Sequence, residues 1–226
     1  HVYGATETGP FVTTSDAKRH FEADSDERFR IKKTQGIGYL GTDVRVVDED
    51  GADVAADGET IGEVVVRGNQ VMDRYWNKPE ATETAFSERL DGYYHTGDLA
   101  VVDGDGFISI QDRKKDIIIS GGENISSIEL EDALFEHDAV ADAAVVPAPD
   151  ERWGETPKAF VVPESGDPSD ASATGEELRA FVRDRVASYK TPGAVEFVAD
   201  LPTTATGKIQ KYELREREWD EEDRMV

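Results

Sequence analysis

The sequence predicts a mixed α+β protein in two parts, a β-rich part over residues 1–112 and a small α+β domain over residues 113–226. Three observations support this division. Short apolar runs bounded by glycine and aspartate dominate the first part, as expected for antiparallel strands. In the second part, apolar residues at helical spacing alternate with strand-like runs. Between the two lies the charged run Asp112–Asp116, where the character of the sequence changes.

The elements of the first part follow from local signals. Residues 1–40 show little clear periodicity. Residues 79–86 predict a short helix, because Pro79 suits a first helical turn. The run Asp103–Gly106 is typical of a hairpin turn between two strands. The strands expected in this part are 43–47, 62–68, 99–102 and 107–110.

The second part predicts elements in the order β-α-β-β-α-β-α, which favours a sheet with helices on one face. Ser126 and Thr174 each precede a glutamate by three residues, the signature of a helix capping box. A last helix is expected over residues 212–219. The expected strands are 117–119, 140–146, 159–162 and 194–198. The first helix is expected to direct four side chains into the core: Ile128, Leu130, Leu134 and Phe135.

The chain is strongly acidic, with 49 Asp and Glu against 25 Lys and Arg and a net charge of −24 at pH 7. This charge argues against nucleic acid or an anionic membrane as a partner, because both need a basic protein face. The bases comprise 15 Arg and only 10 Lys, and concentrated salt would screen the repulsion among the acids. We therefore expect a folded protein from a high-salt cytoplasm.

Several classes of protein and site are excluded or disfavoured. No apolar run reaches the roughly 18 residues of a membrane span and no basic-then-apolar leader is present, so we expect a cytoplasmic protein without membrane insertion. The absence of cysteine excludes disulfides and thiolate chemistry. The histidines lie too far apart in sequence for a helical zinc motif: His1, His20, His95 and His137.

Three glycine-containing patterns resemble ligand-binding motifs but lack what those motifs need. Gly36–Gly41 spells G-x-G-x-x-G, but a strand-like run comes after it instead of the helix that a dinucleotide site needs. Gly207-Lys208 lacks the other residues of a phosphate-binding loop. Asp103–Gly106 has Lys114 where a calcium loop needs its bidentate glutamate.

Four segments combine residue types that suit a nucleotide and a reacting carboxylate. Val2–Gly9 offers a ring, a hydroxyl and a carboxylate, able to stack a base, donate to a phosphate and hold a divalent cation. Asp98 could accept from the hydroxyls of a ribose. Three consecutive bases come after Asp112, ahead of the turn 120–124. Lys208 ends a small loop and could enter a site as a point charge. Taken singly, each segment also suits an ordinary turn, a solvated charge run or a surface lysine.

The order and spacing of these segments resemble the adenylate-forming enzymes: acyl-CoA synthetases, firefly luciferase and the adenylation domains of peptide synthetases. Tyr3–Glu7 resembles their Y-G-x-T-E motif, and Tyr94–Leu99 resembles their T-G-D motif. Asp112–Asp116 is similar to their R-x-K/D hinge motif, and Pro202–Lys208 to their P-x-x-x-x-G-K motif. The likeness is greatest to acyl-CoA synthetases that act on fatty or related carboxylic acids.

The resemblance implies a reaction in two steps, in which ATP and Mg²⁺ support adenylation of a carboxylic acid and CoA then displaces AMP. It implies a nucleotide site of Tyr3, Gly4, Thr6, Asp98 and Arg113, with Glu7 as the metal ligand. It also implies that Lys208, Thr6 and Glu7 are catalytic, that Lys115 is the hinge of a mobile C-terminal domain, and that Ser120, Gly121 and Gly122 line the CoA tunnel.

The resemblance also implies that residues 1–112 are the last part of a large N-terminal domain. The phosphate loop that the family carries upstream of its Y-G-x-T-E motif does not occur in this sequence, so we expect a fragment that cannot catalyse adenylation by itself. Two alternatives stay open: an enzyme that loads a carrier protein instead of CoA, and a non-catalytic interaction module that keeps the fold.

Overall fold

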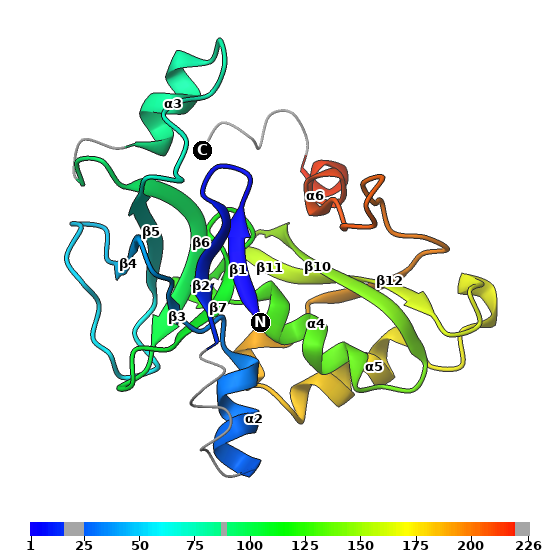
Figure 1. Ribbon diagram of the computed structural model, residues 1–226. Helices are drawn as coiled ribbons and strands as arrows, with labels where there is room; N and C mark the ends of the chain where they lie inside the picture. Colours follow the sequence, from blue (N-terminus) through cyan, green and yellow to red (C-terminus); the bar gives the residue numbers. More distant parts are fainter. Residues whose placement is uncertain (16–24, 87–89, 220–226) are drawn as a thin grey trace. The chain divides into compact units, whose positions relative to one another are not determined.

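The computed structural model describes residues 1–15, 25–86 and 90–219 (Figure 1). The chain divides into two compact units, His1–Lys114 and Lys115–Val226. The division lies just beyond the predicted boundary at residue 112. Sheets dominate, and helices accompany them in both units, so the predicted mixed α+β class is confirmed.

The first unit contains two antiparallel sheets, and its buried apolar side chains come from both. Strands β1 (Val2–Ala5), β2 (Gly9–Thr14) and β3 (Ile37–Gly38) form the first sheet, in the order β1-β2-β3. The second has the order β4-β5-β6-β7 and consists of β4 (Thr42–Val47), β5 (Gly62–Gly68), β6 (Tyr94–Val102) and β7 (Ile108–Arg113). Val12 of the first sheet packs in one cluster with Val64 and Val66 of the second. The described part of the unit also contains the helices α2 (Ser25–Lys33) and α3 (Pro79–Ala85).

Residues 1–40 show little periodicity, yet the described part of this range contains β1, β2, α2 and β3. The helix buries only Ile31, so its sequence has no apolar stripe to reveal it. Strand β2 begins with Gly9 and Pro10 and lacks a regular alternation of buried and exposed residues.

The hairpin turn predicted at Asp103–Gly106 is confirmed. The Asp103 carboxylate accepts hydrogen bonds from the backbone N–H groups of Asp105 (3.0 Å) and Phe107 (2.9 Å). The two strands that the turn joins are longer than predicted. The first begins at Tyr94 and the second ends at Arg113. The segment Tyr94–Leu99 therefore lies on one strand, and the start of the segment Asp112–Asp116 lies on its partner.

The second unit is built on a five-stranded sheet with the order β10-β11-β8-β9, and β12 pairs in parallel with β11. Its strands are β8 (Ile118–Ser120), β9 (Glu123–Ile125), β10 (Val140–Asp150), β11 (Gly154–Pro163) and β12 (Ala194–Phe197). Its α-helices are α4 (Ser127–Phe135), α5 (Gly175–Arg183) and α6 (Lys211–Glu218), and its 3-10 helices are η1 (Pro168–Asp170) and η2 (Ser188–Lys190).

Both predicted helix starts lie where the capping signals place them. The Ser126 hydroxyl accepts from the backbone N–H of Glu129 at 3.2 Å, at the start of α4. At the start of α5, Thr174 and Glu177 form a complete capping box, in which the carboxylate also accepts from the Thr174 backbone N–H at 2.8 Å. Such caps satisfy backbone donors that the first helical turn leaves unpaired.

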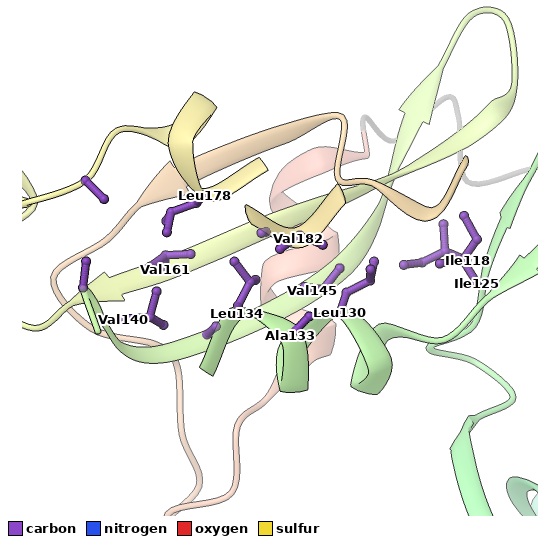
Figure 2. Close-up of a cluster of buried hydrophobic side chains, with 14 residues drawn as sticks. Ile118, Ile125, Leu130, Ala133, Leu134, Val140, Val145, Val161, Leu178 and Val182 are labelled. Carbon is purple, nitrogen blue, oxygen red and sulfur yellow. The ribbon is translucent and has the colours of Figure 1, made fainter. Parts of the chain in front are cut away.

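The prediction that the helices cover one face of this sheet is wrong. On one face, Val145 of β10 packs with side chains of α4 and α5, among them Leu134 and Leu178 (Figure 2). On the other face, Val146 packs with Leu214 of α6. Because neighbouring strand residues point to opposite faces, an entirely apolar run such as 143–146 indicates a strand that is buried on both sides.

Two of the four predicted core residues of α4 are exposed. Ile128 keeps 37% of its surface and Phe135 keeps 47%, whereas Leu130 and Leu134 are fully buried. The buried stripe also includes Ala133, so that Ala133 and Leu134 follow Leu130 at the helical spacings of three and four residues.

The interpretation of Gly36–Gly41 as turn glycines agrees with the elements that the structure places there. Strand β3 occupies Ile37–Gly38 and β4 begins at Thr42, so no helix stands where a pyrophosphate would need one. Among the described helices, none combines the length and the apolar character needed to cross a membrane.

Candidate functional site

Tyr3, Asp98 and Arg113 meet in the first unit. The Tyr3 hydroxyl donates to Asp98 Oδ2 at 2.6 Å, and Arg113 Nε lies 3.2 Å from Asp98 Oδ1. The pairing of β6 with β7 sets Asp98 directly opposite Arg113. Each carboxylate oxygen thus has one protein partner and keeps lone-pair capacity for a further donor.

The surroundings of Tyr3 keep its hydroxyl protonated, so that Tyr3 is the donor and Asp98 the acceptor of their hydrogen bond. Burial raises the pKa of the Tyr3 phenol above its usual value, and the neighbouring Asp98 charge raises it further. Tyr3 therefore remains a neutral donor across the physiological pH range. Asp98 is 9% exposed, and its backbone N–H donates to the Thr96 hydroxyl at 3.0 Å, which fixes the strand at this point.

Thr6 and Glu7 lie in the tight connection between β1 and β2. The Ala5 backbone N–H donates to the Thr8 hydroxyl at 2.9 Å, which closes the connection. Thr6 is exposed and Glu7 is half-buried. Gly4 is required by the close approach of the two strands, because a Cβ there would lie 2.3 Å from the carbonyl oxygen of Gly9.

Tyr75 contacts Glu7, and sequence reasoning gave it no role. Its hydroxyl donates to Glu7 Oε1 at 2.9 Å and lies 3.4 Å from the hydroxyl of Tyr94. Burial raises the pKa of Tyr75, and the hydrogen bond to Glu7 adds to the rise. The only signal in the sequence is the aromatic pair Tyr75-Trp76, and nothing there indicates a partner 68 positions away.

Both backbone polar groups of Gly97, the glycine of the T-G-D segment, are hydrogen-bonded within the first unit. The Gly97 backbone N–H donates to Glu63 Oε1 at 3.1 Å, and its carbonyl accepts from the Lys114 backbone N–H at 2.8 Å. Its φ of 71° lies in the left-handed region that favours glycine. This glycine therefore shapes the strand between Thr96 and Asp98.

The described residues offer few side chains that could share a metal ion. Across residues 1–15, 25–86 and 90–219, no three His, Asp or Glu side chains gather as a metal site, and His20 lies outside these ranges. Mg²⁺ is commonly held by one or two carboxylates together with substrate phosphates. The single half-buried carboxylate of Glu7 fits a Mg²⁺ ion that a nucleotide brings with it.

Lys208 lies on a loop of the second unit, between β12 and α6. Its carbonyl accepts from the Thr204 backbone N–H at 2.8 Å, and its own N–H donates to the Thr204 hydroxyl at 3.1 Å. Gly207, with a φ of 83°, makes the turn between them. The side chain of Lys208 is exposed. The loop thus fixes the backbone of Lys208 and leaves its ammonium group accessible.

Ser120 is the last residue of β8, and Gly121 and Gly122 make the turn from it into β9. Gly121 has a φ of 60° and Gly122 a φ of 88°. A Cβ on Gly121 would lie 2.8 Å from the ring of Trp153, whose carbonyl accepts from the Gly121 N–H at 2.9 Å. Both backbone shape and space therefore require glycine here, and the Trp153 contact was not predicted.

The described part of the first unit also holds an open hollow of about 550 Å³. Asp73, Arg74, Tyr75 and Lys78 belong to its lining, together with residues of α3. None of Tyr3, Glu7, Asp98 and Arg113 lines it. It is therefore a separate feature that shares Tyr75 with the candidate site.

The comparisons with known proteins agree on one family. Residues 1–76 match the AMP-binding enzyme family, and residues 129–208 match the AMP-binding enzyme C-terminal domain. The chain is 45% identical over 219 residues to 2-methylpropanoate–CoA ligase CCL4 of Humulus lupulus, covering 96% of this chain and 39% of that protein. Acetate–CoA ligase CCL3 of the same species is 45% identical over 219 residues, covering 95% of this chain and 38% of that protein.

The solved structures agree with the sequence relatives. o-Succinylbenzoate CoA synthetase from Bacillus subtilis, in complex with its acyl-adenylate intermediate, is 32% identical with a TM-score of 0.79, over 95% of this chain and 40% of that chain. The chain thus spans 39% of the length of the first curated relative it matches. The AMP-binding match precedes the C-terminal-domain match along the chain, and the solved structure covers both. The chain therefore belongs to the adenylate-forming enzyme superfamily.

Proposed function

We propose that the natural full-length protein is an AMP-forming acyl-CoA synthetase for a fatty or related carboxylic acid. The observation that supports this most directly is the Asp98 carboxylate held between the Tyr3 hydroxyl and Arg113. A fixed carboxylate with spare acceptor capacity, beside an aromatic ring and a guanidinium group, suits a ribose and its base. The relatives, which are CoA ligases, support the same reaction class.

Nucleotide binding is assigned to residues of the first unit. Tyr3 packs on the adenine, with Gly4 allowing the strand to turn closely beneath it. Asp98 accepts hydrogen bonds from the ribose hydroxyls, and Arg113 supports the ribose and balances the Asp98 charge. The exposed hydroxyl of Thr6 donates to the α-phosphate. Glu7 would hold Mg²⁺ together with the phosphates of ATP, where the ion would supply positive charge beside them.

Adenylation needs a cation at the reacting atoms, because a carboxylate must attack an anionic phosphate. Lys208 has an accessible ammonium group on a loop whose backbone is fixed. We assign it to bridge the carboxylate and the α-phosphate. A bond then forms between the carboxylate oxygen and the α-phosphorus, and pyrophosphate leaves with the electron pair of the bond that breaks.

Thioester formation uses a different part of the second unit. Rotation about Lys115 removes Lys208 and brings the turn Ser120–Gly122 to the adenylate, where the glycines leave room for the pantetheine arm. The CoA sulfur forms a bond to the acyl carbon, and AMP leaves. Because the phosphate loop of the family does not occur in residues 1–226, we expect these residues alone to be inactive.

The reaction is tested by acid-dependent exchange of pyrophosphate into ATP with the natural full-length protein at high salt. A panel of carboxylic acids identifies the substrate, and mass spectrometry of the product distinguishes CoA from a holo carrier protein as the acceptor. Exchange with no acid of the panel, and no thioester with either acceptor, would favour a non-catalytic module instead.

Replacing Tyr75 with phenylalanine is expected to weaken the apparent activation by Mg²⁺ roughly tenfold, with the KM for the acid unchanged. The hydroxyl that orients Glu7 would be lost, while the ring would remain. The measurement is the Mg²⁺ dependence of pyrophosphate exchange. Tyr93→Phe is the matched control, because that hydroxyl donates to Asp43 instead. Equal Mg²⁺ dependence in the two variants would contradict the assignment of Glu7.

The acidic composition supports a further proposal, a cytoplasmic protein of a high-salt organism. The midpoint temperature of thermal unfolding is expected to rise by more than about 4 °C between ~0.1 M and ~1 M KCl. The Debye length falls from about 10 Å to about 3 Å over this range, which screens the repulsion among the acidic side chains. Screening also weakens ion pairs such as Arg45–Asp53, but acids outnumber bases by almost two to one, so relief of repulsion prevails. A midpoint independent of KCl, followed by circular dichroism, would contradict the proposal.

A further inference from the structure

Arg215 on α6 binds the first two residues of the second unit. Its Nη1 atom donates to Asp116 Oδ1 at 2.6 Å and to the backbone carbonyl of Lys115. The pair is largely shielded from water, with 19% of the Arg215 side chain and 12% of the Asp116 side chain exposed. Hydrogen bonds between ionised groups are strong, and shielding from solvent reduces their screening by salt. The contact therefore fastens the start of the second unit to α6.

A second hydrogen bond holds the end of the first unit. The Lys114 backbone N–H donates to the carbonyl of Gly97 at 2.8 Å. A peptide group is planar, so a bond to its N–H or its carbonyl orients the whole group. Gly97 thereby fixes the peptide 113–114 within the first unit, and Arg215 fixes the peptide 115–116 within the second. Only the φ and ψ angles of Lys114 and Lys115 lie between these two fixed groups.

Helix α6 is itself anchored in the second unit. Lys211, its first residue, forms an ion pair with Glu131 at 2.6 Å, and its Nζ also donates to the Ser127 hydroxyl at 2.7 Å. Leu214 is fully buried against the sheet. The loop that carries Lys208 leads directly into this helix. One anchored element therefore connects the Lys208 loop with residues 115 and 116.

We propose that Arg215 is a positioning residue that confines the rotation of the second unit to the backbone torsions of Lys114 and Lys115. This inference rests on the proposed two-step function. A rotation that is limited to four torsions delivers Lys208 and the Ser120–Gly122 turn to defined places. Without Arg215, the 115–116 peptide and the torsions of Asp116 are also free, and Asp116 loses its ionic partner.

The structural arm of the test is hydrogen exchange by mass spectrometry on the natural full-length protein. Arg215→Met is expected to speed exchange of the amides of residues 114–118 roughly tenfold, with the rest of the second unit unchanged. Arg217→Met is the matched control, because Arg217 is exposed on the same helix. Arg215→Lys, which keeps the charge, should lie between the wild type and Arg215→Met.

The kinetic arm measures the two half-reactions separately. Arg215→Met is expected to lower the rates of adenylation and of thioester formation by similar factors, with the KM for ATP changed less than about twofold, because the assigned nucleotide residues lie in the first unit. Arg215→Lys should recover part of both rates, and it decides the test if Arg215→Met does not fold.

Three results would overturn the proposal: unchanged exchange at 114–118, faster exchange throughout the second unit, or local loosening without a fall in either rate. The exchange arm does not depend on activity. If the wild type catalyses neither half-reaction, the proposed function fails, while the exchange of residues 114–118 still decides whether Arg215 holds this peptide.

Discussion

Replacing Lys208 with alanine is expected to abolish adenylation and to leave thioester formation from supplied acyl-adenylate intact. Two anions meet only in the first half-reaction, so only that step needs the ammonium group at the reacting atoms. The substitution leaves the backbone hydrogen bonds between Lys208 and Thr204 in place, so the loop should keep its shape. Acid-dependent pyrophosphate exchange should fall by about 10²–10³-fold.

Two control variants sharpen this experiment. Lys208→Arg keeps the charge but changes its geometry, so it should retain some exchange. Lys32→Ala removes an exposed lysine of α2 in the first unit and should behave as the wild type. If Lys208→Ala slowed both half-reactions equally, the separate roles assigned to the two steps would be wrong.

The parts of the fold that the sequence predicted are those with strong local signals. The capping residues Ser126 and Thr174 begin helices, and Asp103–Gly106 closes a hairpin. Local signals did not reveal α2 or β2. Neither sequence has a regular apolar period, and tertiary packing contributes much of the stability of such elements. Local signals also did not reveal that α6 packs on the second face of the sheet. Only the packing of Leu214 against Val146 settles that.

The candidate site divides in the same way. The order of motifs along the chain led to Tyr3, Asp98 and Arg113. The pairing of β6 with β7 sets Asp98 opposite Arg113, and a side-chain hydrogen bond from β1 of the other sheet brings Tyr3 to Asp98. Tyr75 and Arg215 could not be predicted, because each acts through a partner that is far away in sequence. Such contacts are fixed by tertiary packing, and no spacing rule for helices or strands describes them.

Net charge first argued against polyanionic partners, and the site limits that inference. Nucleic acid needs an extended basic face, whereas ATP and CoA need only a few well-placed cations. The chain supplies Arg113 beside Asp98 and an accessible Lys208, although it has only 25 bases in total. The acidic surplus therefore describes the surface in contact with solvent, and the positions of single bases describe the proposed site.

A proline at position 115 is expected to slow thioester formation by about 10²-fold while adenylation changes only a few-fold. Proline fixes φ near −65° and disfavours the helical region for the preceding residue, so it restricts the torsions of both Lys114 and Lys115. These are the residues left between the peptide bound by Gly97 and the peptide bound by Arg215. The substitution keeps the carbonyl of residue 115, so the contact with Arg215 remains available.

The matched variant is Lys115→Ala, which removes the same side chain and leaves the backbone free. If rotation about this residue separates the two half-reactions, the alanine variant should catalyse both, and only the proline variant should accumulate acyl-adenylate when CoA is present. Single-turnover measurements with quenched product analysis distinguish the two variants. Equal rates of thioester formation in both would mean that the torsions of residues 114 and 115 do not limit the second step, and the pivot would have to lie elsewhere in the chain.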